Sequence, residues 1–212
     1  LYFFTENTAL GITQASNVSF IICTAPLLTT ILSLLFYKSE KASKGLIYGS
    51  LLALMGVGLI VFNGSFVLKI SPIGDLLTLL AALSWAFYSL IIKKMAGRYP
   101  TVFITRKIFF YGVLTILPAF LLHPLQPDAA VLLQPGVLFN LLFLAVLASL
   151  ICYVLWNVVL KQLGTVRASN YIYLNPLVTM IASSLILDEK ITLVALGGAA
   201  CIVCGVYWAE KK

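Results

Sequence analysis

The stretch PLLTTILSLLFYKSE at residues 26–40 is matched by the stretch PLVTMIASSLILDE at residues 176–189. Both begin with a proline, continue as an apolar run and end in an acidic turn. The match extends to the flanking residues, at a spacing that drifts only from 153 to 149 residues: Leu10 and Gly11 with Leu163 and Gly164, Ala15 to Asn17 with Ala168 to Asn170, Gly49 with Gly198, and Gly56 and Val57 with Gly205 and Val206. The chain therefore contains one structural unit twice.

The composition is that of a chain that faces lipid. Hydrophobic residues make up 61% of its 212 residues, charged residues make up only 10%, and the mean hydropathy is +1.06. Soluble domains average roughly 25% charged residues. The net charge of +7 comes from basic residues in short loops between apolar runs, which is topology information and not a nucleic-acid-binding patch. The composition thus predicts the lipid bilayer, and no nucleic acid, as a partner.

The apolar runs are long enough to cross a membrane. A spanning helix needs about 20 largely apolar residues for a hydrocarbon core of ~30 Å. Seven runs qualify, and an eighth, partial run ends near Gly11: the seven are 18–37, 45–63, 74–95, 104–122, 136–160, 169–187 and 191–209. A membrane barrel would need short alternating segments instead. We expect an all-α transmembrane protein with about eight spans, the first one partial.

Lysines and arginines divide unequally between the two sides of such a membrane protein. Two, Lys69 and Lys190, fall on one side. Twelve fall on the other: Lys38, Lys41, Lys44, Lys93, Lys94, Arg98, Arg106, Lys107, Lys161, Arg167, Lys211 and Lys212. The positive-inside rule places the twelve, and the C-terminus, in the cytoplasm. Glu40 then lies inside and its counterpart Glu189 outside, so the two copies are inverted, as is typical of secondary transporters.

The repeat also predicts how the chain is organised. Residues 1–66 correspond to the C-terminal part of a first repeat, and residues 67–212 to a complete second one. The first span of the second copy begins near Asp75, 101 residues before Pro176. The same distance before Pro26 falls outside the chain, which begins without a Met. We therefore expect a longer protein of ten spans, five in each half.

Three stretches resemble the EamA-like family of the drug/metabolite transporter superfamily. They are residues 15–61, residues 167–207 and LLTLLAALSWAFYSLIIKK at residues 76–94. The resemblance implies a ten-helix carrier of the bacterial cytoplasmic membrane that exports small metabolites such as amino acids, nucleobases or drugs by alternating access around a central cavity. The chain departs from the family pattern in lacking the first spans and in having Lys38, Ser39 and Glu40 where a Gly-Glu turn is usual.

The chemistry of an enzyme is not visible in these spans. None of the seven has an acidic or basic residue in its middle third, and the one His, His123, lies at the end of a span. The four cysteines are scattered through apolar runs, so no metal site or cofactor is predicted. A passive channel and a non-transporting membrane subunit remain the alternatives to a carrier.

Polar and aromatic residues at membrane depth are the candidates for substrate contact. They form stripes at helical spacing and comprise Ser84, Trp85, Tyr88, Tyr153, Trp156, Asn157, Asn170 and Tyr173. Flat rings with hydrogen-bonding groups suit a zwitterionic or planar metabolite. The alternatives are aromatic belts at the membrane surface, hydrogen bonds between helices and, for Asn170, a helix N-cap.

Prolines and small residues predict how the helices bend and pack. Pro26 and Pro176 would loosen equivalent helices, either as paired hinges for alternating access or as static bends. Small residues four apart allow close helix packing, within one subunit or between two in a homodimer: Gly45, Gly49 and Ala53 in one run, and Gly197, Cys201 and Gly205 in another.

Overall fold

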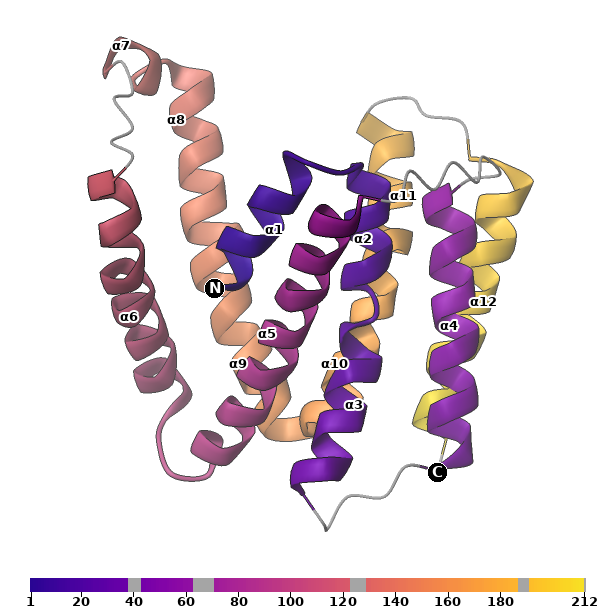
Figure 1. Cartoon of the computed structure of the whole chain (residues 1–212). Coiled ribbons are helices and arrows are strands. Elements are labelled where there is room, and N and C mark those ends of the chain that lie inside the picture. Colours follow the sequence, from indigo (N-terminus) through magenta and orange to yellow (C-terminus); the bar gives the residue numbers. More distant parts are fainter. Residues whose placement is uncertain (38–42, 63–70, 123–128, 187–190, 212) are drawn as a thin grey trace. The chain divides into compact units, whose positions relative to one another are not determined.

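The computed structural model describes residues 1–37, 43–62, 71–122, 129–186 and 191–211 (Figure 1). Every regular element within these residues is helical. The α-helices are α1 (Tyr2–Leu10), α2 (Ala15–Ile22), α3 (Ala25–Phe36), α4 (Lys44–Phe62), α5 (Pro72–Ala96), α6 (Thr101–Leu122), α7 (Ala129–Leu132), α8 (Pro135–Leu142), α9 (Cys152–Leu163), α10 (Thr165–Asn170), α11 (Asn175–Ile186) and α12 (Leu193–Glu210). A π-helix, η1 (Phe143–Ile151), joins α8 to α9, and a 3-10 turn, η2 (Tyr171–Leu174), joins α10 to α11.

Six helical stretches among the described residues are long and apolar enough to cross a membrane. They are Ala15–Phe36, Lys44–Phe62, Pro72–Ala96, Thr101–Pro118, Pro135–Leu163 and Leu193–Glu210. Each coincides with a predicted span, which confirms an all-helical membrane protein. The predicted run 169–187 forms α10, η2 and α11 up to Ile186, and the partial first run forms the short α1.

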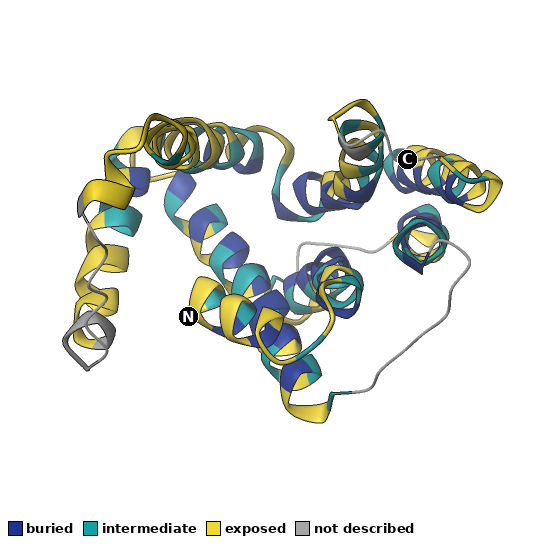
Figure 2. Ribbon diagram, turned by 90° about the horizontal axis from the view of Figure 1, so that it is seen from above, coloured by how far each residue is buried: buried dark blue, intermediate teal, exposed yellow. Residues whose placement is uncertain are grey.

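The chain divides into two compact units. Unit 1 comprises Leu1–Ile91 and Gly164–Lys212, and unit 2 comprises Ile92–Leu163. In unit 2, no residue of α8 or η1 is buried, and Figure 2 shows how much of the chain is exposed. Apolar side chains such as Leu142 and Leu144 are more than half exposed, as lipid-facing residues are. The predicted repeat boundary at 66/67 lies outside the described residues.

Unit 1 contains a close helix pair, α4 and α12, which run antiparallel side by side (Figure 1). A Cβ atom added to Gly205 would lie 2.5 Å from the carbonyl oxygen of Gly49, and one added to Gly56 would lie 2.5 Å from that of Gly198. Only glycine permits this approach of the two backbones. We call these four residues the glycine seam. It lies within one chain, so a homodimer would have to use another face.

In α12, Gly205 of the predicted stripe of small residues lies in the contact, but Gly197 does not. A Cβ atom on Gly197 would meet nothing within 4 Å, whereas Gly198 faces α4. Cys201 belongs to the contact as predicted, because its Cβ lies 2.9 Å from the position of a Cβ on Gly56. The buried core of unit 1 continues from this contact through Val57, Ile202 and Tyr173.

Two helices of unit 1 are interrupted directly before a proline. α2 ends at Ile22 and α3 begins at Ala25, so Pro26 lies in the first turn of α3. In the same way η2 separates α10 from α11, where Pro176 is the second residue. A proline in a first turn lacks an N–H that would have no partner there anyway. The predicted breaks therefore exist at both prolines, while their role as hinges stays a prediction.

Candidate functional site

Unit 1 encloses a cavity of about 490 Å³. This volume falls within the ~300–1,000 Å³ of ordinary small-molecule sites. Its wall is formed by α1, α2, the end of α4, α11 and the beginning of α12, and it is mostly apolar. The polar side chains in it are Glu6, Ser16, Ser19, Asn175 and Thr179. A mostly apolar wall with a few polar groups is suited to a small organic ligand.

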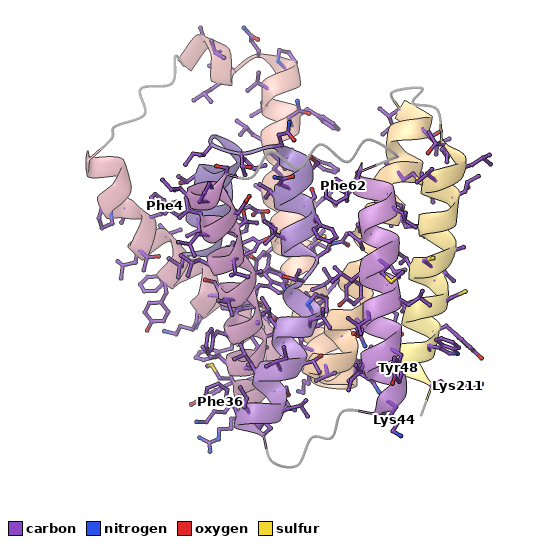
Figure 3. All side chains as sticks on the ribbon, turned by 45° about the vertical axis from the view of Figure 1, so that its right-hand side comes forward. Phe4, Phe36, Lys44, Tyr48, Phe62 and Lys211 are labelled. Carbon is purple, nitrogen blue, oxygen red and sulfur yellow. The ribbon has the colours of Figure 1, made fainter. Side chains whose placement is uncertain are left out.

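The cavity lies at one end of unit 1. Ile60 and Val61 at the end of α4 and Ala195 at the beginning of α12 line it, and because α4 and α12 are antiparallel these residues share one end. At the opposite end α10 packs against α3, and Thr29 and Ser169 are fully buried there. Figure 3 shows Lys44, Tyr48 and Lys211 at that opposite end of the α4–α12 pair, with Phe62 at the cavity end.

Glu6 on α1 is the charged residue of this wall, with no other among its described residues. Its Oε1 accepts a hydrogen bond of 3.3 Å from the Tyr2 hydroxyl, one helical turn away. Glu6 is absent from the predicted site residues because the run that contains it is too short to count as a complete span. One feature of the sequence could have indicated it. An acidic residue inside an otherwise apolar segment is a candidate functional residue, whatever the length of the segment.

Two of the predicted aromatic residues are linked to Glu6 through Tyr2, and neither lines the cavity. The ring centroids of Tyr2 and Trp85 are 5.3 Å apart, and those of Trp85 and Tyr88 are 5.4 Å apart. We call Tyr2, Trp85 and Tyr88 the aromatic cluster. It joins α1 to α5 and ends one hydrogen bond from the Glu6 carboxylate. Ser84 is turned to its own helix, since its hydroxyl donates to the Leu80 carbonyl at 2.8 Å.

The predicted residues of α9 lie in unit 2. The Asn157 side chain is 1% exposed, and its Nδ2 donates to Thr105 Oγ1 of α6 at 2.9 Å. Tyr153 makes an edge-on contact with Phe109, with centroids 5.5 Å apart, and Trp156 is half-buried one turn further on. These contacts favour the alternative in which such residues tie helices together.

Asn170 and Tyr173 are fully buried and do not line the cavity. Asn170 is the last residue of α10, and its side chain makes no capping hydrogen bond. Its Oδ1 instead accepts a weak hydrogen bond of 3.4 Å from Ser50 of α4. Tyr173 packs in the core beside Cys23 and Val57. Of the predicted residues, Pro176 alone is found among the described residues of the cavity wall.

The arrangement of apolar helices around a cavity agrees with the sequence comparison. The profile of the EamA-like transporter family matches residues 72–209. The chain belongs to this family. An EamA-like chain is a multi-pass membrane protein of transporter type and not an enzyme.

Several known proteins are similar to this chain over most of its length. An uncharacterized transporter of Archaeoglobus fulgidus is 30% identical over 96% of this chain and 70% of its own length. A probable amino-acid metabolite efflux pump of Salmonella typhimurium is 29% identical over 81% of this chain and 60% of its own length. A probable amino-acid metabolite efflux pump of Escherichia coli is 24% identical over 94% of this chain and 69% of its own length. One crystal structure superposes on 99% of this chain and 71% of its own chain, with a TM-score of 0.82 and 19% sequence identity. This similarity shows a shared fold.

Proposed function

We propose that the protein is a secondary transporter that exports small organic metabolites by alternating access. The observation that carries the proposal is the cavity of about 490 Å³ at one end of unit 1, whereas at the other end α3 packs against α10, which we take as the sealed end. Transporter cavities are accessible from one side at a time. The names of the two efflux pumps above favour amino-acid metabolites as the substrate class.

The glycine seam supports an inverted repeat as the basis of this mechanism. The sequence match makes Gly49 equivalent to Gly198 and Gly56 equivalent to Gly205. Gly49 contacts Gly205, and Gly56 contacts Gly198. Replacing each residue of the first contact by its equivalent in the other repeat gives the second contact. Such reciprocal contacts are those of a two-fold axis. Ten spans in two inverted halves would complete the arrangement.

The same equivalence supports two gates. It pairs α2 with α10 and α3 with α11. α3 packs against α10, whereas α2 and α11 both line the open cavity. The pair α3 and α10 is thus packed together, while the equivalent pair α11 and α2 lines the cavity. If the two pairs exchanged these arrangements, the cavity would open at the other end. The breaks before Pro26 and Pro176 are where each helix would bend.

The charges of unit 1 support an orientation. The sealed end carries Lys44, Arg167 and Lys211, and basic residues flank the cytoplasmic side of membrane helices. We place this end, with the C-terminus, in the cytoplasm of a bacterial-type inner membrane. The cavity would then face outward in this state, and the outward state is the one in which an exporter releases its substrate.

Counterflow in proteoliposomes tests the proposal. Vesicles that contain the complete protein are loaded with an unlabelled amino-acid metabolite and diluted into a trace of the labelled compound. A carrier would accumulate label transiently, because each inward step is paired with an outward one, whereas a passive channel would only equilibrate it. Absence of counterflow across a panel of amino acids, their amides, nucleobases and cationic drugs would contradict the proposal and favour the non-transporting subunit.

A further inference from the structure

We propose that Glu6 binds the ammonium group of the transported substrate, and that the substrate is an amine with an apolar body and without a free carboxylate. This inference rests on the proposed function, because it assigns the substrate class of the same cavity. It is carried by the place of the Glu6 carboxylate in the cavity wall, by the neutral residues around it, and by the aromatic cluster behind it.

The surroundings of Glu6 favour a positively charged ligand. Leu10, Ile22 and Ile60 are among the apolar side chains of the same wall. A carboxylate next to apolar surface loses hydration, and its attraction to a cation is stronger there than in water. The Tyr2 hydroxyl, at 3.3 Å, makes only a long hydrogen bond. A carboxylate accepts at about four lone-pair positions, so an ammonium group can still be bound.

The described part of the wall supplies Glu6 with no basic partner. No lysine, arginine or histidine is found among the described residues of the wall. The remaining polar side chains are neutral: Ser16 and Ser19 on α2, and Asn175 and Thr179 on α11. They suit a hydroxyl, an amide or a carbonyl group on the ligand. The carboxylate of a zwitterion would be repelled by Glu6 and would meet no basic partner in the described wall. Such an arrangement selects amines over free amino acids.

The aromatic cluster holds the anchor in place. Tyr2 donates to Glu6 and is itself packed against Trp85, which in turn packs against Tyr88. These ring contacts restrict the rotation of Tyr2 and so favour one position of the Glu6 carboxylate. Trp85 and Tyr88 are thus positioning residues for the anchor, which gives two of the residues expected from sequence a role one step away from the substrate.

Ligand binding to the complete protein in detergent tests the assignment. Thermal stabilisation is measured with leucinamide and a series of primary alkylamines as cationic probes. Leucine is the zwitterionic probe, and 4-methylpentanamide is a neutral probe that matches leucinamide without its amino group. We expect the cations to bind, leucine to bind much more weakly, and Glu6→Gln to weaken the cations about 10- to 100-fold, the range of a hydrogen bond to a charged group. Glu6→Asp should retain part of the affinity.

Two controls separate loss of the anchor from loss of the fold. Asp75→Asn removes a carboxylate that lies outside the cavity wall, and it should leave leucinamide binding unchanged. The neutral 4-methylpentanamide should bind Glu6→Gln and the parental protein equally. If no amine of the series binds the parental protein, or if Glu6→Gln binds leucinamide as tightly as the parent, the proposal is wrong.

A proton is the other cation that a carboxylate could carry. If Glu6→Gln keeps its affinity for amines and loses only the response of transport to a pH gradient, Glu6 serves proton coupling and the substrate assignment is overturned. Failure of the wider function would look different: the parental protein would bind amines in a Glu6-dependent manner and yet give no counterflow.

Discussion

Single glycines determine how closely α4 and α12 approach, and they give the most direct test of the packing. A methyl group at Gly205 would lie 2.5 Å from the backbone of α4, whereas one at Gly197 on the same helix meets nothing within 4 Å. We expect Gly205→Ala to lower the free energy of unfolding by about 1–3 kcal/mol, the range for overpacking. Gly197→Ala should be neutral or stabilising, by up to ~1 kcal/mol of helix propensity. Thermal unfolding in detergent compares the two, and equal midpoints would contradict the seam.

The amide of Asn157 gives a second prediction about a single residue. It donates to Thr105 at 2.9 Å between two helices of unit 2, and such bonds in membranes contribute about 0.6 kcal/mol and at most ~1.7. A double-mutant cycle with Asn157→Ala and Thr105→Val should show a coupling of this size in unfolding. If Asn157 contacts substrate instead, its substitution will weaken transport affinity and show no coupling to Thr105.

The breaks before Pro26 and Pro176 can be tested by restoring a continuous helix. Pro176→Ala should restore a backbone donor and allow the helix to continue from α10 into α11, which would favour one gate state over the other. We expect transport to slow while expression and thermal stability stay near the parental values. Pro26→Ala, at the equivalent break, should act in the same way, and counterflow rates measure both. Parental rates in both variants would make the breaks static features of packing.

At the level of helices, the sequence predicted the spans and the breaks but not the π-helix η1. Six of the seven predicted runs coincide with helices that are long and apolar enough to cross a membrane, and the prolines predicted both breaks, because length and a missing donor act locally. A stripe at helical spacing assumes 3.6 residues per turn, but the residues directly before Tyr153 include the π-helix η1, where the wider turn changes the register. The sequence FLAVLASLI contains no glycine or proline to signal that change.

The residues of the site were harder to predict for a related reason. The partner of Asn157 is 52 residues away along the chain, and the partner of Asn170 is 120 residues away. Spacing along one helix cannot tell whether its stripe faces a cavity or a neighbouring helix. Glu6 was missed because its run is too short to count as a complete span, and the packing of α1 against α2 brings it to the cavity.

Across the whole molecule, the asymmetry of the two ends predicts which positions reagents can reach. In a background without the four native cysteines, Thr179→Cys in the cavity wall should react with a membrane-impermeant thiol reagent added to intact cells. Ser169→Cys at the sealed end should stay unlabelled, because Ser169 is 0% exposed. Lys94→Cys should react only after permeabilisation. Labelling of Lys94→Cys from outside would reverse the orientation and the assignment of the open end.

The glycine seam has a consequence for biosynthesis. Its two helices are made at different times, since roughly 130 residues separate the end of α4 at Phe62 from the start of α12 at Leu193. At ~5–20 residues per second, translation of that interval takes roughly 7–26 s. During this time the glycine face of α4 lies in the bilayer against acyl chains, or against an insertion factor, without the helix that later covers it. The close contact across the glycine seam therefore forms only after the last helix has been made.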